Sequence, residues 1–202
     1  NQLFENYLHG EFTLNRNVKK NYLNNELKIK SRWDKQTGLV YSGNDYIQQS
    51  LKNPLGAISN ELHSVSPVGK QLVEFNSYFS YDNRPHSLKV NPGQFEEVLN
   101  MGNAYEEVKQ ILDLERFFTD NSAGFVVGWK RLSFQPRLGF SYRQQMLESS
   151  ITKTLLDDEV KAEPDFENQL DGRDKRIYCQ TNVEYRKSDL TIKLRMPLSW
   201  HQ

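Results

Sequence analysis

Apolar and polar residues alternate strictly along residues 177–198. Apolar side chains occupy every second position of two arms, and polar or charged side chains fill the positions between them. A period of two is typical of a β-strand with one apolar and one polar face. A turn at 187–188 would bring the apolar residues of both arms to one side of a hairpin and place Arg186 opposite Asp189 as a favourable charge pair. A register shift of one residue would instead set apolar residues opposite polar ones.

The same alternation predicts three further hairpins. In each of them a tight turn brings the apolar residues of both arms to the same side. None of the turns contains Asn-Gly or Asp-Gly, the strongest short hairpin signals, so the matching of faces carries the prediction. Pro136 lies within a predicted arm, and we expect an irregular ladder there because proline has no backbone N–H to donate. The four hairpins cover about 3–33, 72–90, 111–142 and 177–199, with turns at 18–19, 82–85, 130–131 and 187–188.

Long polar connections are expected between the hairpins. Residues 34–70 and 144–175 contain several Gly and Pro residues or acidic runs, which favour loops. A third connection covers about 91–108. A strand over 57–65 is an alternative within the first connection, and a short helix near 152–161 is an alternative within the last.

Residues 105–118 fit either an amphipathic helix or a strand, because their apolar spacing satisfies both periods. We favour a strand over 111–118, since the turn that follows then matches the other hairpins. The chain as a whole predicts an all-β fold. We expect an antiparallel up-and-down meander of about eight strands, a partial or small β-barrel with long loops and little helix, in one segment over 1–202.

Short turns alternate with long connections along the predicted meander. This is the connection rule of bacterial outer-membrane barrels, and arms of about ten residues match a tilted strand that crosses about 25 Å of hydrocarbon. On this interpretation the apolar face meets lipid and the charged face lines a wet interior. The alternative is a soluble β-sandwich or small barrel that acts as a binding module, for example for carbohydrate. Its sheets would also have one face on a core and one face in water.

The barrel interpretation assigns places to two sets of residues. Trp and Tyr concentrate at membrane–water interfaces, so aromatic residues near the predicted strand ends form an interfacial set. Charged residues that alternate with the apolar positions form a second set, which would tune what passes through a lumen or hold a plug. The predicted interface aromatics are Trp33, Trp129, Tyr142, Tyr185 and Trp200, and the predicted lumen-facing charges are Lys28, Lys30, Arg32, Glu184, Lys193 and Arg195.

The amino-acid composition argues against several classes of function. Hydrophobic residues make up 37% of the chain, which suits strands that need no dry core, and the mean hydropathy of −0.76 agrees. The 26 basic residues equal the 26 acidic ones, so a nucleic-acid binder, which needs a basic excess, is not expected. One cysteine, Cys179, excludes an internal disulfide framework. No run of about 18 apolar residues occurs, so no transmembrane helix is expected.

The sequence contains no recognisable catalytic or cofactor-binding pattern. Its four His residues are scattered without metal-ligand spacing. Cys179 has no base beside it in sequence, and its place on the apolar face suits a small hydrophobic residue better than a nucleophile. The acidic run 157–159 is consecutive, so its side chains diverge as in a solvated loop. We therefore expect no enzyme activity, no metal site and no cofactor.

Three stretches resemble a known family. Residues 21–27 (NYLNNEL), 81–88 (YDNRPHSL) and 132–142 (LSFQPRLGFSY) are similar to the barrel repeats of TonB-dependent-receptor-type outer-membrane proteins of the Bacteroidetes kind. The resemblance extends over most of the chain and consists of loose strand and turn patterns. It implies a location in the bacterial outer membrane, a many-stranded barrel with an internal plug domain, and energised uptake of a nutrient or metal chelate by a receptor.

The chain departs from that family in two respects. It contains no plug-like stretch and no candidate for the segment that contacts TonB, and about eight strands are too few for a receptor barrel. The sequence is therefore interpreted as a segment of a barrel whose parent protein performs the transport. The implied partners are outer-membrane lipid and, through the absent plug, the TonB system. In isolation the segment is expected to self-associate because its apolar face needs cover.

Overall fold

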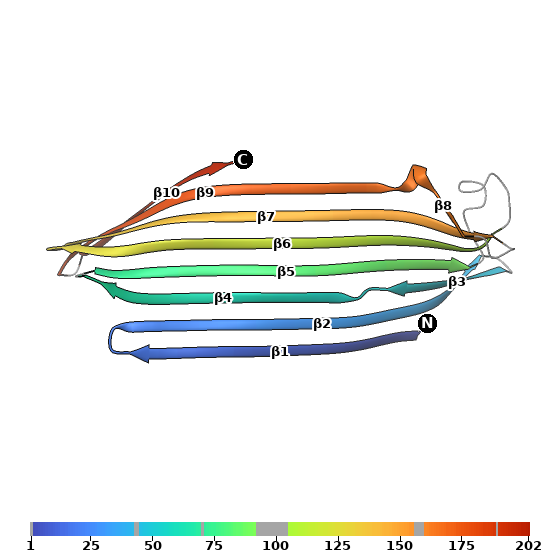
Figure 1. Cartoon of the computed structure of the whole chain (residues 1–202), viewed down its shortest axis with the longest axis horizontal. Coiled ribbons are helices and arrows are strands. Elements are labelled where there is room, and N and C mark those ends of the chain that lie inside the picture. Colours follow the sequence, from blue (N-terminus) through green and yellow to red (C-terminus); the bar gives the residue numbers. More distant parts are fainter. Residues whose placement is uncertain (1, 43–44, 70, 92–104, 156–159, 189) are drawn as a thin grey trace.

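The computed structural model describes residues 2–42, 45–69, 71–91, 105–155, 160–188 and 190–202, which form one antiparallel sheet (Figure 1). The prediction of an all-β meander is therefore confirmed. The strands are β1 (Gln2–Val18), β2 (Asn21–Ser42), β3 (Asp45–Lys52), β4 (Leu55–Val68), β5 (Gln71–Asn91), β6 (Tyr105–Trp129), β7 (Leu132–Leu155), β8 (Val160–Ala162), β9 (Asn168–Lys187) and β10 (Leu190–His201), with a short 3₁₀ helix, η1 (Pro164–Phe166).

Strands β3 and β4 are two parts of one strand that is broken at a proline. Both pair with β2 on one side and β5 on the other in the same register, and the N–H of Asn53 still donates to the carbonyl of Asp34 at 2.9 Å. Pro54 then follows, and the register places Pro85 of β5 opposite it. Neither proline can donate a ladder hydrogen bond, which accounts for the break. With β3 and β4 counted as one, eight long strands cross the sheet in chain order, as predicted.

The four tight turns lie along one edge of the sheet, here called the tight-turn edge (Figure 1). The predicted turn at 130–131 is confirmed, because Trp129 pairs with Leu132. The first and last turns lie one residue later than predicted, at 19–20 and 188–189. This moves the register by two residues, which leaves every side chain on its predicted face. It also places Arg186 opposite Thr191, so the predicted pairing of Arg186 with Asp189 is wrong.

The register separates the side chains into two faces. The ladders are continuous from β1 to β10, so a residue's place in its strand determines its face across the whole sheet. The apolar face includes Phe12, Leu23, Ile29, Phe75, Phe125, Val127, Phe134, Leu138, Phe140, Ile177, Val183, Leu194 and Met196; the polar face includes Glu26, Lys28, Lys30, Asp82, Arg116, Asp120, Arg137, Arg176, Glu184 and Lys193.

The predicted hairpin at 72–90 is wrong. Residues Gln71–Asn91 form the single strand β5, and the turn expected at 82–85 lies within it. The alternative strand over 57–65 is present as β4, so the second tight turn follows Val68. Pro85 suggested a turn from sequence, but its missing N–H falls at the break beside Pro54, where no ladder partner is required.

The connections predicted at 34–70 and 144–175 are also mostly strand. β2 continues to Ser42, β7 continues to Leu155 and β9 begins at Asn168. These extensions are mostly polar, and their few apolar residues do not alternate regularly, so they lack the period of two that marks the remainder of each strand. The strand chosen for 111–118 is confirmed as part of β6.

Two sequence predictions fall partly outside the described residues. The described residues of the helix considered near 152–161 are strand instead, because they belong to the end of β7 and to β8. Residues 156–159 between them are not described. The connection at 91–108 is described only at its ends, which belong to β5 and β6. The irregularity expected at Pro136 is confirmed, because the β6–β7 ladder has no pair between Gly124↔Arg137 and Val127↔Phe134.

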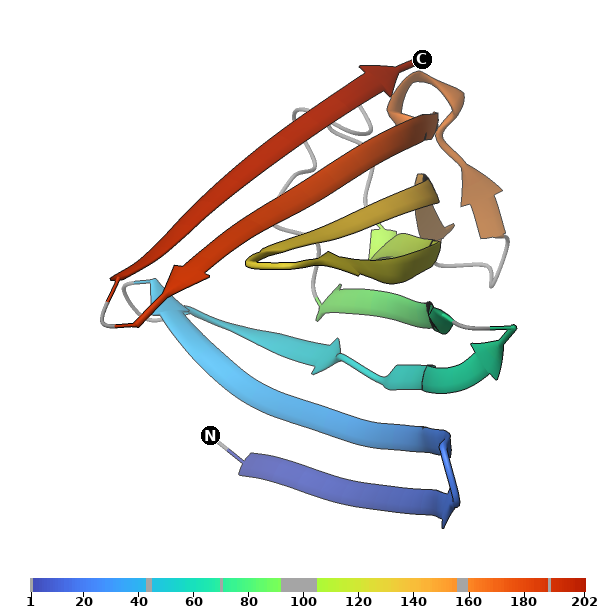
Figure 2. The ribbon, with the colours of Figure 1, turned by 90° about the vertical axis from the view of Figure 1, so that its left-hand side faces the viewer.

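The sheet is curved and has a single layer (Figure 2). β1 and β10 are the two outermost strands of the sheet and do not pair with each other. Within the described ranges the buried hydrophobic residues are Ile47, Val90 and Val108, and the apolar face is exposed; Leu138, for example, is 61% accessible. A soluble sandwich or closed small barrel would cover this face with a second layer or its own interior. The described sheet instead has the form of part of a barrel.

The hairpins are displaced along the strands in regular steps. One row of paired residues crosses the whole sheet from Asn17 to Pro197. This row lies one residue from the turn in the first hairpin, then three, five and seven residues from the turns of the next three. Each hairpin is thus offset by two residues from its neighbour, always in the same direction.

Each tight turn begins with a residue of positive φ. These residues are Lys19, Gly69, Lys130 and Ser188, with φ between 46° and 63°. Positive φ at the first turn position belongs to the primed turns that suit the right-handed twist of a hairpin. Glycine adopts such angles without steric cost, whereas lysine and serine do not.

We expect Lys19→Gly to stabilise the refolded chain by about 0.5–1 kcal/mol, because it relieves an unfavourable φ. Urea unfolding in detergent micelles, followed by circular dichroism, would measure the change. Lys20→Gly is the matched control, since Lys20 lacks a positive φ in the described backbone and glycine there should bring no gain. Equal effects of the two substitutions would contradict this account of the turn.

Candidate functional site

The six predicted lumen-facing charges all lie on the polar face. Lys28, Lys30 and Arg32 alternate with apolar residues of β2, and Lys193 of β10 lies directly opposite Glu184 of β9. The structure does not bring the six together, because β2 and β9–β10 lie near opposite edges of the sheet. Most of them have local partners: Lys28 with Glu26 at 2.6 Å, Arg32 with Asp34 at 2.8 Å, Glu184 with Arg186 at 2.6 Å and Arg195 with Gln180 at 3.0 Å.

A charged cluster on β5 and β6 occupies the middle of the polar face. Arg116 donates from Nε and Nη2 to Asp82 at 2.8–3.1 Å, and Arg84 donates from Nε to the same carboxylate at 3.0 Å. Asp82 and Arg116 are direct cross-strand partners, which favours this geometry. The cluster was missed because residues 82–85 were interpreted as a turn. The spacing of Asp82 and Arg84, two residues apart as on one face of a strand, was the signal available.

A second cluster lies nearer the tight-turn edge and is centred on Glu74 of β5. Arg137 of β7 donates from Nη2 to Glu74 at 2.9 Å, and Asn76 donates to the same oxygen at 3.1 Å. His63 of β4 lies on the other side, with Nε2 3.3 Å from Glu74. The contact from β7 to β5 passes over β6 at Gly124, which has no side chain to obstruct it.

A third cluster joins β9 to β6 across β7. Tyr178 donates its hydroxyl to Asp120 at 2.6 Å, and Arg176 lies 3.6 Å from the same carboxylate. The guanidinium of Arg176 also lies over the Tyr178 ring, 5.2 Å from its centroid. The Tyr178 ring covers Gly139, where a Cβ atom would come within 2.1 Å of it. Glycine at this position is therefore what lets the tyrosine reach two strands away.

These contacts define the shape of the polar face. Neighbouring strands are about 4.8 Å apart, so partners separated by an intervening strand must lean toward each other to meet. The described contacts to Glu74 and to Asp120 that span a strand lie on the polar face. Convergent side chains of this kind indicate that the polar face is the concave one, which is the interior side of a barrel.

Polar residues also interrupt the apolar face at mid-height. Ser77 of β5 donates to Asn121 of β6 at 2.6 Å, and Asn121 donates to Thr119 at 2.9 Å. Asn60 of β4 donates to Asn25 of β2 at 2.9 Å. The alternation within single strands gave no sign that these residues meet across strands. Their mutual hydrogen bonds lower the cost of placing polar groups on an apolar surface.

The predicted interface aromatics lie on the apolar face at two heights. Trp129 and Tyr185 lie beside the tight-turn edge, on either side of Leu132 in one row. Tyr142 and Trp200 lie ten residues from the turns of their hairpins, and Trp33 lies twelve from its turn. This arrangement suits two interfacial belts, and the membrane role of these residues remains a prediction.

The described surface contains shallow hollows and no evident catalytic centre. A hollow of about 210 Å³ lies on the polar face over Ala57 and Ser59, between Lys30 and Asp82. In the described ranges no group of three or more His, Cys, Asp or Glu residues could hold a metal ion. Cys179 is half-buried and lies between Leu138 and Leu198 in the ladder, as expected for a small hydrophobic residue.

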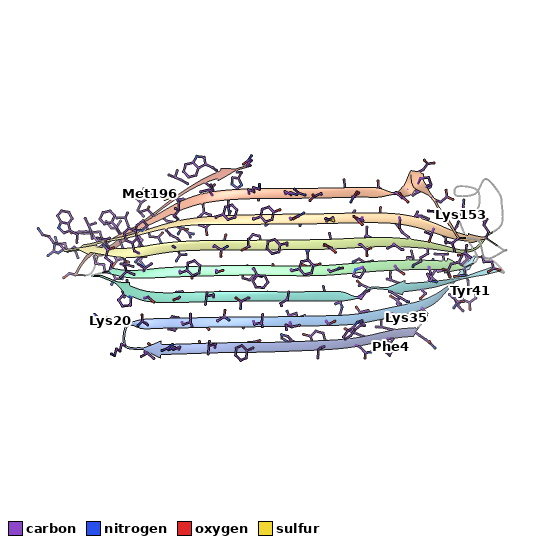
Figure 3. The ribbon with its side chains drawn as sticks, viewed as in Figure 1. Phe4, Lys20, Lys35, Tyr41, Lys153 and Met196 are labelled. Atoms are coloured by element: carbon purple, nitrogen blue, oxygen red, sulfur yellow. The ribbon has the colours of Figure 1, made fainter. Side chains whose placement is uncertain are left out.

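The strands extend beyond the apolar part of the sheet toward the edge opposite the tight turns. Figure 3 shows Tyr41 and Lys153 near this end and Lys20 at the tight-turn end. On β9 the side chain of Arg173 donates to Asp171 at 2.5 Å, and this hydrogen bond lowers the pKa of the Asp171 carboxyl below its ordinary value. Charged pairs exposed to water are thus found where the apolar face has ended.

Comparisons with known proteins give little additional information. No family model and no curated protein matches the chain. Among solved structures, the outer membrane transporter YddB from Escherichia coli is similar at a TM-score of 0.27 and 6% sequence identity. The match covers 98% of this chain and 34% of that chain, so this chain spans about a third of the transporter. No helix in the described part of the chain is long and apolar enough to cross a membrane.

We expect Gly139→Ala to destabilise the protein by about 1–2 kcal/mol, because the added methyl displaces the Tyr178 ring and breaks its hydrogen bond to Asp120. Urea titration followed by near-ultraviolet circular dichroism would measure both the stability and the environment of the tyrosine. Gly128→Ala is the matched control, because nothing lies within 4 Å of its added Cβ. Identical unfolding of the two variants would show that Tyr178 does not depend on Gly139.

Proposed function

We propose that this chain is a segment of a β-barrel of the bacterial outer membrane. The observation that carries the proposal is the predominantly apolar band on one face of a curved, single-layered sheet. In β7, β9 and β10 the band begins at the tight turn and extends over about ten residues. The next residues on the same face are polar, and they are Gln144, Lys175 and Gln202. Ten to twelve residues at about 3.3 Å each and a tilt of about 40° span roughly 25–30 Å, the height of a hydrocarbon core.

On this proposal the polar face lines the interior. A wet lumen suits the ion pairs around Glu74, Asp82 and Asp120, which would be costly against lipid. The predicted lumen charges then act on whatever occupies the interior, either a solute in passage or a plug domain. The tight turns face the periplasm and the extended strands continue beyond the outer surface, in keeping with the general rule for these barrels.

The finer proposal is that the parent protein is a receptor of the TonB-dependent type that takes up a nutrient or a metal chelate. The barrel-repeat resemblance at 21–27, 81–88 and 132–142 supports it. Its partners would be outer-membrane lipid and, through a plug in the parent, the TonB system; nucleic acid is not proposed. The chain would act in transport without an enzyme activity or cofactor of its own. Alone, it would self-associate through its exposed apolar face and its two unpaired edges.

Spin labels on adjacent residues of β10 would test the barrel proposal in the full-length parent. Leu194 and Arg195 lie at nearly the same depth on opposite faces. In a cysteine-free background, a label at Leu194→Cys should collide with oxygen dissolved in lipid, and a label at Arg195→Cys should collide with a water-soluble nickel chelate. Equal accessibilities, or a parent that is freely soluble and unchanged in mobility on heating, would contradict the proposal.

A binding measurement would test the receptor type separately. The detergent-purified parent should bind the purified carboxy-terminal domain of TonB from the same organism, because an energised receptor must contact TonB. Calorimetry would detect the complex. A parent variant that lacks its plug serves as the control and should not bind. A barrel that inserts in membranes but never binds TonB would retain the barrel proposal and remove the receptor type.

A further inference from the structure

Basic residues are concentrated at the tight-turn edge of a chain whose net charge is zero. Counted with one flanking residue on each side, the four turns cover 18–21, 68–71, 129–132 and 187–190. These stretches contain six Lys or Arg residues and one Asp. Lys19, Lys20, Lys130 and Arg131 are all exposed. The edge therefore presents a row of cations to its surroundings, and Figure 3 shows Lys20 at its margin.

The compensating acidic residues are concentrated elsewhere in the sequence. Residues 91–108 and 155–168 contain ten of them and one lysine, and the described parts of these ranges lie at the strand ends opposite the tight turns. The neutrality of the whole chain thus conceals a separation of charge along the strands. Such a separation favours anionic surroundings at the basic end and cationic surroundings at the acidic end.

The basic residues lie directly beside the apolar face. Lys130 Nζ lies 5.7 Å from the centroid of the Trp129 ring, and Trp129 is 63% accessible on the apolar face. The N–H of Arg186 donates to the carbonyl of Arg131 at 2.9 Å, which holds the third and fourth hairpins side by side at this edge. The nearby carboxylate of Glu184 is on the polar face and is already paired with Arg186. Among the described residues, no acidic side chain forms a salt bridge with Lys130 or Arg131.

We propose that the tight-turn edge binds the headgroups of anionic phospholipids in the leaflet that it faces. This inference rests on the proposed barrel function and adds a lipid specificity to it. An exposed cation beside an exposed tryptophan and an apolar band matches a ligand that is anionic at one end and apolar at the other. A soluble acidic protein would satisfy the cations but would leave Trp129 and the adjoining apolar residues uncovered, so lipid is the occupant that the arrangement favours.

The test uses the full-length parent reconstituted into nanodiscs of phosphatidylcholine with one fifth phosphatidylglycerol. Native mass spectrometry would count the two lipids that remain bound after mild extraction. The double variant Lys130→Gln with Arg131→Gln removes two charges from the tight-turn edge. The control, Lys35→Gln with Lys52→Gln, removes two exposed lysines that pair with each other on β2 and β3 at the other end of the apolar face.

We expect the wild type to retain phosphatidylglycerol preferentially. The preference should fall about fivefold for each basic residue removed from the tight-turn edge, and it should weaken in high salt. The control variant should keep the wild-type preference. Equal loss in both variants, no preference in the wild type, or displacement of the lipid by a soluble acidic peptide would each overturn the inference. Heat-modifiability of the same samples tests the barrel separately. A barrel that inserts but shows no lipid preference would overturn only the lipid inference. A parent that fails to insert would overturn the barrel proposal and the lipid inference together.

Discussion

Backbone hydrogen bonding between neighbouring strands is the interaction on which the rest of this structure depends. The chain has no second layer and very little buried hydrophobic area in its described part, so the ladders from β1 to β10 provide its continuity. Those ladders also determine the face of every side chain, because pairing in register keeps alternate residues on the same side. The apolar band and the charged face are both consequences of this single constraint.

The period of two was enough to predict the all-β fold, the meander and the faces of the first, third and fourth hairpins. In β5, which was predicted as a hairpin, Val73 and Leu88 were expected on one face and lie on opposite faces of a single strand. A turn misplaced by one residue changed the register by two, and Leu194 and Lys193 remained on their predicted faces. The extensions of β2 and β7 were not predicted as strand, because they are mostly polar and their few apolar residues do not alternate. The prediction also failed at Pro85, because proline marks turns and strand breaks alike and sequence alone does not show that Pro54 lies opposite.

The candidate site was predicted less well than the fold, for a physical reason. Strand parity showed that Lys28 and Glu184 share a face, but it carries no information about partners on other strands. The clusters at Asp82, Glu74 and Asp120 join two to three strands, and two of them depend on glycines that clear a path over an intervening strand. Such contacts require the order of the strands and the curvature of the sheet, neither of which is local.

The regular offset of the hairpins has a geometric consequence. An offset of two residues for every two strands corresponds to a shear of about one residue per strand. With a rise of about 3.3 Å and a strand separation of about 4.8 Å, this gives an inclination of about 35° to the axis of a closed cylinder. The tight turns then lie on a common ring perpendicular to that axis. If the proposed barrel closes with further strands, regular closure would require those strands to continue the same offset, so these eight strands would set the inclination of the whole barrel wall.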